Sequence, residues 1–308
     1  MRSPTMDTPT GGRRSVPLGA PRRARGLALI VAMLVAALTA AVAAALVADE
    51  SLWSSKVAHR QDQVQAQSLA RAGIKWARQI LAVTPGAAPI VTLNDPWALP
   101  LPPTPIEGGS VEGRITDAQG LFNLGNLAID EPGRGARAGF ERLAANLALP
   151  ADAVPRIANW IASRQYLAAS AGHGAFVPLV AGELAGIPGL APPTLVALAP
   201  YVVALPPKTP LNVNTAPAAL LAAALQGLDR DQADALVESR RTRPFTSIED
   251  FRSRLPSGAT AGDLDRYAVG SEYFLVAVTA REGDTIADAS ALLRTHAGSV
   301  TIVWQRVD

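Results

Sequence analysis

The sequence predicts an α+β fold: a long N-terminal helix packed on an antiparallel sheet, with a large, mainly α-helical domain inserted between the strands of the sheet. The first observation is an uncharged apolar run near the N-terminus that continues into a segment with helical spacing. The second is that strand-like segments lie on both sides of the chain's centre: residues 84–126 contain an alternating segment, and residues 266–308 contain segments rich in Val, Ile, Tyr, Phe and Trp. The third is an Ala- and Leu-rich block, residues 127–265, which separates them and is therefore expected to be an insertion in one sheet.

The composition is that of a folded protein without thiol chemistry. The chain has 308 residues, of which 49% are hydrophobic and 18% charged, which is enough apolar material for a buried core. It contains no cysteine, which excludes a disulfide framework, a thiolate metal site and a thiol nucleophile. His59, His173 and His296 are far apart in sequence and show none of the usual metal-binding spacings. No catalytic residues are predicted, and the chain is not expected to be an enzyme.

The positive charge of the chain is concentrated at its N-terminus. Residues 1–26 contain six arginines and one aspartate, a net charge of +5, whereas the whole chain carries +2. Residues 27–308 therefore carry −3, so the high isoelectric point does not indicate a nucleic-acid-binding domain.

Residues 27–48, "LALIVAMLVAALTAAVAAALVA", are predicted to cross a membrane. These 22 residues carry no charge and suffice for a hydrocarbon core of about 30 Å. The arginines before the run should remain cytoplasmic, so the rest of the chain should be exported. Two alternatives are an ordinary cleavable signal peptide, whose apolar core is usually shorter, and a generic single-span anchor.

The helix is expected to continue beyond the membrane, through residues 49–83. Leu69, Gly73, Trp76 and Ile80 recur at helical spacing and fall on one face of an amphipathic helix. A single helix over about residues 27–81 is therefore predicted. The alternative is a membrane span followed by a separate surface helix.

Strands are predicted on both sides of the helical block. "SVEGRITDAQGLFNL", residues 110–124, alternates around a turn-forming "TDAQG" and is interpreted as a β-hairpin. "EYFLVAVTARE" (272–282), "TIADASALLRT" (285–295) and "GSVTIVWQRV" (298–307) are predicted to be consecutive strands, with a turn at Gly283.

Residues 211–251 predict a pair of short helices joined by a turn, an arrangement that some proteins use to bind DNA. Thr215 is expected to cap the first helix, which buries Ala219, Leu220, Ala223 and Ala224. The second helix is predicted over Asp231 to Arg241, with Ala233, Leu236 and Val237 facing inward. Thr246 or Ser247 should cap a third helix.

The turn of this helix pair argues against DNA binding. Such modules generally need a glycine-rich turn that lets backbone N–H groups approach phosphate. Here the turn is "QGLDRDQ", with one glycine and two aspartates that would repel phosphate. Arg240, Arg241 and Arg243 form a basic cluster in sequence. The helix pair is interpreted as a packing unit, and a membrane-anchored DNA-uptake protein is kept as the alternative function.

The junction at residues 22–38 resembles that of type IV prepilins. A basic leader, "RRARG", ends at Gly26 directly against the apolar run that begins at Leu27. In that class a membrane peptidase cuts after the glycine, here between Gly26 and Leu27. Most members have glutamate at the fifth mature position, which here is Val31. This departure, together with "GRITDAQGLFNLGNL", "GELAGIPGL", "LNVNTAPAALLAAAL" and "SEYFLVAVTA" in that order, resembles the minor pseudopilin K family of type II secretion systems.

The resemblance implies a division of the chain and a function. Residues 1–26 would be the prepilin leader, 27–48 the membrane part and 49–83 the periplasmic part of the helix. Residues 84–126 and 266–308 would form the pseudopilin domain, with the helical domain inserted at 127–265. The implied protein is a minor pseudopilin at the tip of the periplasmic pseudopilus, needed to start assembly and to export folded proteins, with its N-terminus in the cytoplasm.

The resemblance also implies partners and a possible ligand. The partners would be minor pseudopilins I and J, the prepilin peptidase, which would cleave the chain before its new N-terminus is methylated, and the inner membrane, but no nucleic acid. Members of the family are associated with calcium, bound by carboxylates that follow a tryptophan. After Trp160 this chain has no acid before Glu183, so the acidic ligand cluster is missing. The resemblance therefore leaves calcium open, with its site either lost or rebuilt from carbonyls, and no cofactor is certain. Glu183 would be a remnant ligand or a helix cap.

Overall fold

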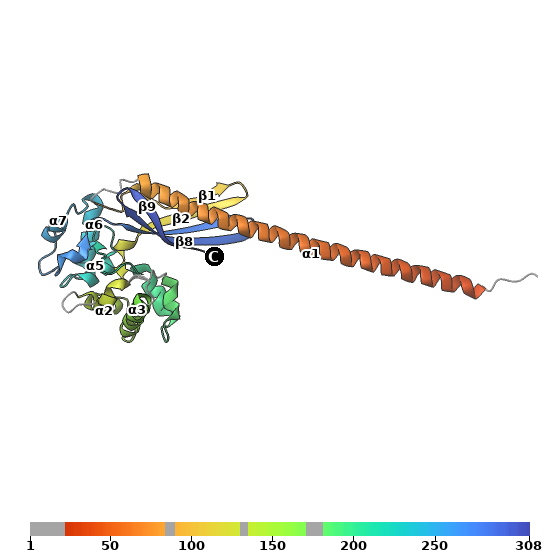
Figure 1. The fold of residues 1–308 in the computed structure, drawn as a ribbon, viewed down its shortest axis with the longest axis horizontal. Coiled ribbons are helices and arrows are strands. Elements are labelled where there is room, and N and C mark those ends of the chain that lie inside the picture. The colour runs from red at the N-terminus through yellow and green to blue at the C-terminus, as the bar shows by residue number, and fades with distance from the viewer. Residues whose placement is uncertain (1–21, 84–89, 130–134, 171–180) are drawn as a thin grey trace, which may run out of the picture. The chain divides into compact units, whose positions relative to one another are not determined.

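The structure is a computed structural model that describes residues 22–83, 90–129, 135–170 and 181–308 (Figure 1). Side chains are described within these ranges except at 22–28, 45–55, 58, 165–170 and 181–182. The chain divides into two compact units, residues 1–59 and 60–308. In the first unit the described residues belong to the N-terminal part of one helix, α1 (Arg22–Val83). The predicted single long helix is confirmed.

Unit 60–308 is built on an antiparallel sheet of five strands in the order β1-β2-β7-β8-β9. Its strands are β1 (Leu101–Ile106), β2 (Gly109–Asp117), β7 (Tyr273–Glu282), β8 (Thr285–His296) and β9 (Ser299–Val307). The last three strands match the predicted C-terminal strands. Gly283 (φ +53°) lies in the β7–β8 turn, and Ala297 (φ +49°) and Gly298 (φ +78°) form the β8–β9 turn. The α+β fold class is confirmed.

The last turns of α1 pack on one face of this sheet, and Leu69 and Ile80 of the predicted apolar face pack, partly buried, against the same cluster. The buried positions are Ala66, Ala70, Ile74, Ala77 and Leu81. They meet side chains from alternate positions of the strands: Ile115, Phe274, Val276, Val278, Ala289, Ala291 and Leu293. Trp76, which shares the predicted face with Leu69 and Ile80, is 47% exposed. Small alanines let α1 lie close to the sheet, and such residues do not stand out in a hydrophobic pattern.

Gly73 lies where α1 closely approaches the sheet. A Cβ atom at this position would lie 2.6 Å from Cγ1 of Val278 and 3.0 Å from its Cγ2. Since only glycine avoids that overlap, Gly73 has a packing reason to be inside a helix despite its low helix propensity.

A block of helices interrupts the sheet between β2 and β7 (Figure 1). Its helices are α2 (Ala136–Asn146), α3 (Ala153–Ser170), α4 (Pro192–Leu198), α5 (Ala218–Ala224), α6 (Arg230–Thr242) and α7 (Ile248–Ser253). Two short parallel pairs accompany them: β3 (Phe122–Asn123) with β4 (Val202–Val203), and β5 (Leu211–Asn212) with β6 (Tyr267–Ala268). The exact boundaries 127 and 265 stay predictions.

Short 3-10 helices connect these elements. They are η1 (Pro96–Ala98), η2 (Ala118–Gly120), η3 (Leu124–Ile129), η4 (Ala181–Gly186), η5 (Ala199–Tyr201) and η6 (Leu264–Arg266). Two hydrophobic clusters fill the block, one around Phe140 and Ile157 and the other around Phe245 and Phe251. The block therefore has cores of its own, distinct from the cluster between α1 and the sheet.

The predicted hairpin at 110–124 is wrong. β2 pairs with β1 and β7, whereas the segment after "TDAQG" forms β3 and pairs in parallel with β4. The aspartate of that motif, Asp117, caps the 3-10 helix η2 by accepting a hydrogen bond from the backbone N–H of Gln119. The actual hairpin is β1–β2, whose first strand contains three prolines that are typical of a linker.

Within the part of the chain that the structure describes, no helix has both the length and the apolar character needed to cross a membrane.

Candidate functional site

The buried carboxylate of Asp117 joins the helical block to the end of β2. Besides the N–H of Gln119, it accepts hydrogen bonds from the hydroxyl of Ser271 (2.6 Å), the hydroxyl of Thr215 (2.5 Å) and the side-chain amide of Asn212 (2.9 Å). Thr215 lies just before α5, Asn212 belongs to β5 and Ser271 lies just before β7. One carboxylate thus connects both ends of the insertion to the sheet.

Burial raises the pKa of Asp117 above its usual range. The hydrogen bonds from Ser271, Thr215, Gln119 and Asn212 act in the opposite direction, since they favour the charged carboxylate. Only 2% of the residue is exposed, so its protonation is coupled to the integrity of this junction. The sequence alone indicates only a turn former at Asp117, because the surrounding hydroxyl and amide donors are too far away in the chain to be associated with it.

Buried asparagines hold the loops around the junction. Asn123 accepts hydrogen bonds from the N–H groups of Gly125 (2.8 Å) and Leu205 (2.9 Å). Asn214 accepts from the N–H of Phe245 (2.8 Å) and donates to its carbonyl (3.0 Å). The "LNVNT" motif therefore supplies amides that satisfy buried backbone groups, which is an architectural role.

The helix pair is confirmed, with one error in its caps. Helix α5 has Pro217 at its N-cap, and the hydroxyl of Thr215 points to Asp117 instead of capping the helix. Helix α6 starts with a capping box made by Asp229 and Gln232, and Ser247 caps α7. Of the side chains predicted to face inward, Ala224 and Val237 are only partly buried. The turn aspartate Asp229 is thus used for capping.

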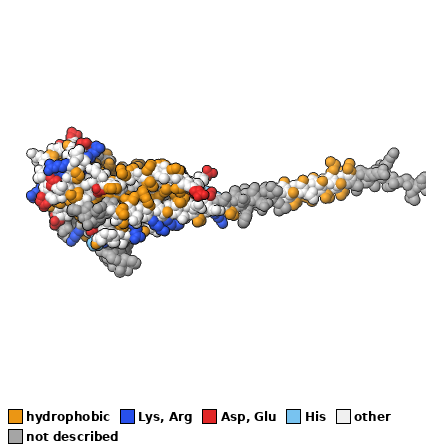
Figure 2. Space-filling view, turned by 90° about the horizontal axis from the view of Figure 1, so that it is seen from above, with side chains coloured by type: hydrophobic (Ala, Val, Ile, Leu, Met, Phe, Trp, Pro, Cys, Tyr) orange, Lys and Arg blue, Asp and Glu red, His pale blue; other side chains and the backbone are white. Residues whose placement is uncertain are grey.

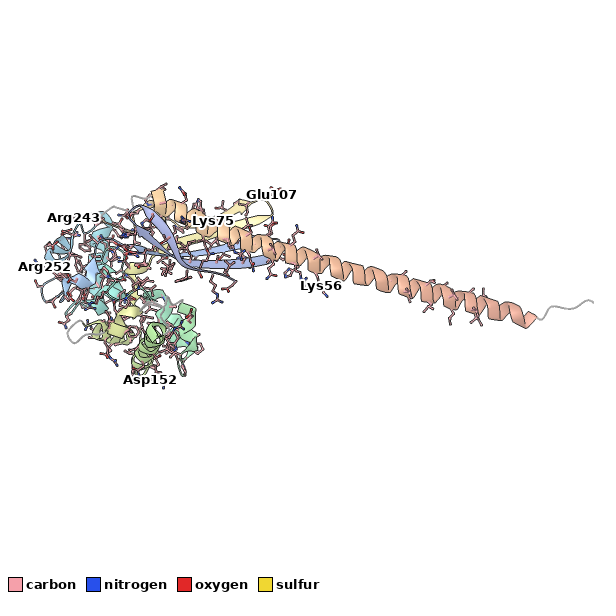
Figure 3. The ribbon with its side chains drawn as sticks, in the orientation of Figure 1. Lys56, Lys75, Glu107, Asp152, Arg243 and Arg252 are labelled. Atoms are coloured by element: carbon pink, nitrogen blue, oxygen red, sulfur yellow. The ribbon has the colours of Figure 1, made fainter. Side chains whose placement is uncertain are left out.

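The three arginines of the predicted basic cluster do not form one cationic surface. Arg240 is 5% exposed, and its guanidinium donates to the carbonyl of Val213. Burial lowers the pKa of Arg240 to about 10. Arg241 pairs with Glu238 at 3.0 Å, and Arg243 lies on the surface at the α6–α7 end of the block (Figure 3). The geometry gives the DNA-binding alternative no support.

The histidines and Glu183, for which the sequence gives no metal-binding spacing, are not brought together in the described part of the chain. No group of three or more His, Asp or Glu side chains that could hold a metal occurs there. Glu183, in the first turn of η4, pairs with Arg164 at 3.0 Å, and that arginine lies over the ring of Trp160. His296 lies 3.6 Å from Glu272, whereas His173 falls outside the described residues. Glu183 therefore has an ion-pair role here.

The residues of the predicted processing site lie in the N-terminal unit. The backbone of Gly26 and Leu27 belongs to α1, and the side chain of Leu27 is outside the described residues. Val31 is described, and 53% of its surface is exposed within its own unit. Cleavage after Gly26 and the significance of Val31 stay predictions.

A helix packed along an antiparallel sheet, with a helical block inserted between two neighbouring strands, defines a pilin-like α+β protein. Residues 211–270 match the family described as type II secretion system (T2SS), protein K. Curated relatives carry the same name: "Type II secretion system protein K" of Pseudomonas aeruginosa is 32% identical over 219 residues, which cover 64% of each chain. That of Pectobacterium carotovorum is 27% identical over 241 residues, 68% of this chain and 74% of the relative.

The fold is also that of a solved structure. A chain of the GspK-GspI-GspJ complex from the enterotoxigenic Escherichia coli type 2 secretion system superposes with a TM-score of 0.65 and 21% identity, covering 82% of this chain and 99% of that chain. The resemblance to the type II secretion protein K family is confirmed. The alignment to the Pseudomonas relative spans less than two thirds of that protein's length.

Proposed function

We propose that this protein is a minor pseudopilin at the tip of the periplasmic pseudopilus of a type II secretion system. There it helps to start pseudopilus assembly and supports the export of folded proteins across the outer membrane. Its role is structural and uses no catalytic group. The partners proposed are minor pseudopilins I and J, in line with the GspK-GspI-GspJ complex of E. coli, one chain of which has the same fold.

The position of the helical block in unit 60–308, at one end of the sheet, supports the proposal. The block leaves the sheet after Asp117 and returns at Tyr273, at the same end as the C-terminal turns of α1 (Figure 1). In a filament of parallel helices rooted in a membrane, that end points away from the membrane. Bulk at that end would prevent a further subunit from stacking above, which suits a terminal subunit.

The N-terminal part of α1 is proposed to anchor the chain in the inner membrane. Residues 27–48 would cross it once, with the arginine-rich leader in the cytoplasm and the remainder in the periplasm. Small side chains in this segment would let neighbouring helices approach closely; they are Ala36, Ala37, Ala40, Ala43 and Ala44. The prepilin peptidase would cut between Gly26 and Leu27, and the new N-terminus would be methylated.

The absence of a carboxylate at Val31 is consistent with a first subunit. An acid in a membrane helix is unfavourable by about 2.5–3.5 kcal/mol unless it is paired. A subunit with no neighbour ahead of it has no amine to pair with such an acid, so an apolar residue is favoured.

The test is the mature N-terminus of the full chain after co-expression with a prepilin peptidase, measured by mass spectrometry of the membrane fraction. The expected chain starts at Leu27, and Gly26→Val should remain uncut. A chain that starts near Asp49, or that keeps its leader when the peptidase is active, would contradict the pseudopilin assignment. Co-purification with pseudopilins I and J from detergent extracts tests the tip role separately.

A further inference from the structure

Arg266, the last residue of the 3-10 helix η6, is half-buried and has no hydrogen-bond acceptor in the described part of the chain. The other buried or half-buried arginines described there each donate to a carbonyl or pair with a carboxylate; they are Arg142, Arg164, Arg240, Arg254 and Arg294. The Arg266 guanidinium instead lies 5.9 Å from the centre of the Tyr267 ring. A guanidinium has five N–H donors, so a half-buried one without an acceptor in the protein indicates an acceptor from outside it.

Arg266 lines a cavity of about 190 Å³ in the helical block, together with Lys208, Asp263 and Asp265. Among the described residues neither Lys208 nor Arg266 forms an ion pair, although Asp265 and Arg266 are neighbours in the chain. On the face shown in Figure 2, the end of unit 60–308 that carries the helical block has Lys and Arg side chains interspersed with Asp and Glu. Charges of both signs are therefore common on this surface, but around this cavity they do not neutralise one another.

The backbone holds Lys208 at the cavity. Its φ of +69° lies in the left-handed region, and its N–H donates to Oδ1 of Asn126 (2.8 Å), which lines the same cavity. Glycine would adopt this conformation more readily than lysine, so the turn alone does not account for the residue. What lysine adds at this position is its ammonium group.

A smaller cavity of about 40 Å³ adjoins the first, because Asn126, Ala136, Thr209 and Arg266 line both. Most of its other lining side chains are apolar, including Phe122, Leu205, Leu211 and Leu220. One water-sized sphere occupies about 10–15 Å³, so this inner chamber has room for a small branched alkyl group but not for an aromatic ring.

The charges of the lining select the class of ligand. A phosphate dianion would be attracted by Lys208 and Arg266 but repelled by Asp263 and Asp265. A zwitterion suits all four groups, because its carboxylate can pair with the guanidinium and the ammonium while its own ammonium faces the carboxylates. A few polar groups that fix orientation beside an apolar chamber are typical of small-molecule sites.

We propose that this cavity binds a zwitterionic α-amino acid with a small branched side chain, such as valine. Its carboxylate pairs with Arg266 and Lys208, its ammonium lies toward Asp263 and Asp265, and its side chain enters the inner chamber. The site goes beyond the proposed function and does not depend on it, because neither the tip role nor a partner pseudopilin enters the argument.

Saturation-transfer NMR on the full chain in detergent tests the site with valine, N-acetylvaline, valinamide and phenylalanine. Valine should bind with a dissociation constant of about 1 mM, as expected for a ligand of this size. N-acetylvaline lacks the ammonium and valinamide lacks the carboxylate, so each should bind about tenfold or more weakly. Phenylalanine should also bind weakly, because its ring exceeds the inner chamber.

Variants of the lining test which residues hold the ligand. Arg266→Gln and Lys208→Gln should each weaken valine binding about tenfold. Neither side chain has an ion-pair partner among the described residues, so thermal unfolding of both variants should stay close to that of the unaltered chain. Lys75→Gln removes the same charge from the exposed surface of α1 (Figure 3) and should leave valine binding unchanged. Ala224→Val, in the lining of the inner chamber, should weaken the binding of valine more than that of alanine.

Four outcomes would overturn the proposal. Valinamide that binds as well as valine, or binding that Arg266→Gln leaves unchanged, would exclude the carboxylate contact. N-acetylvaline that binds as well as valine would mean that the cavity accepts the C-terminus of a polypeptide instead of a free amino acid. Absence of binding by every ligand well above the millimolar range would mean that the cavity holds only water. None of these outcomes bears on the pseudopilin assignment, which the mature N-terminus tests.

Discussion

The hydroxyl of Thr215 donates a hydrogen bond to the carboxylate of Asp117, although 98 positions separate the two residues. Asp117 ends β2, and Thr215 precedes α5, so the bond joins the sheet to the helical block. Both residues are buried.

Thr215→Val should destabilise the protein by about 1–3 kcal/mol, because it removes one donor from a buried carboxylate while keeping the side-chain volume. Urea unfolding of the purified full chain measures the change. Thr301→Val, at an exposed position of β9, serves as the control and should have little effect. Equal unfolding free energies for Thr215→Val and the unaltered chain would mean that the junction adds nothing to stability.

The Asp117 carboxyl should give the stability a specific pH dependence. Its folded pKa is raised by burial, so between its unfolded pKa and that raised value the folded state holds more protons than the unfolded state. Its contribution is therefore fully present below the unfolded pKa and is lost as pH rises through the folded pKa. The difference in unfolding free energy between the unaltered chain and Asp117→Asn should shrink over that window. A difference that grows with pH would contradict the raised pKa.

Arg240→Ala should cost about 2 kcal/mol or more in unfolding free energy. The substitution leaves the buried carbonyl of Val213 without the guanidinium donor and removes the packed stem of the arginine. Arg241→Ala, one residue further along α6, is the matched control and should change stability by less than about 0.5 kcal/mol. Similar losses for both variants would show that burial of Arg240 is not what distinguishes them.

Gly73→Ala should destabilise the protein even though alanine favours helices by about 1 kcal/mol over glycine. The new methyl group would overlap Val278, and overpacking of this kind typically costs about 1–3 kcal/mol. In a Val278→Ala background the overlap is relieved, so Gly73→Ala should become neutral or stabilising there. A double-mutant cycle by chemical denaturation measures the coupling, and additive effects would refute it.

Val31→Glu should impair pseudopilus assembly and protein secretion if the chain occupies the tip. The new carboxylate would lie unpaired in the membrane, whereas Val31→Leu keeps the position apolar and should be tolerated. Secretion by a strain that lacks the native protein, complemented with each variant, is the measurement. Normal secretion with Val31→Glu would show that the tip role does not require an apolar residue at position 31.

Local patterns in the sequence predict the long helix, the last three strands and the helix pair, because each depends on residues close in the chain. They do not predict the buried face of α1, since Ala66, Ala70 and Ala77 are weakly hydrophobic while the exposed Trp76 dominates the pattern. The spacing of Ala66, Ala70, Ile74, Ala77 and Leu81 is the signal that could have revealed this face.

The pairing of β2 and the role of Asp117 depend on residues far apart in sequence. In the sheet β2 pairs with β7, which follows the whole helical block in the sequence. The donors to Asp117 lie at Asn212, Thr215 and Ser271, which no local periodicity connects to it. The arginine cluster at Arg240 looks cationic in sequence because spacing does not reveal that one member is buried.

The pairing of β2 with β7 also constrains the order in which the protein can fold. Residues 118–272 must be synthesised before β2 can pair with β7, so the β1–β2 hairpin leaves the ribosome long before the sheet can close. Contacts between residues so distant in the chain slow folding and leave apolar strands unprotected in the meantime. The prolines of β1 have no N–H groups to donate, so the outer edge of the β1–β2 hairpin pairs poorly with strands of other chains. This limits mispairing before β7 has been synthesised.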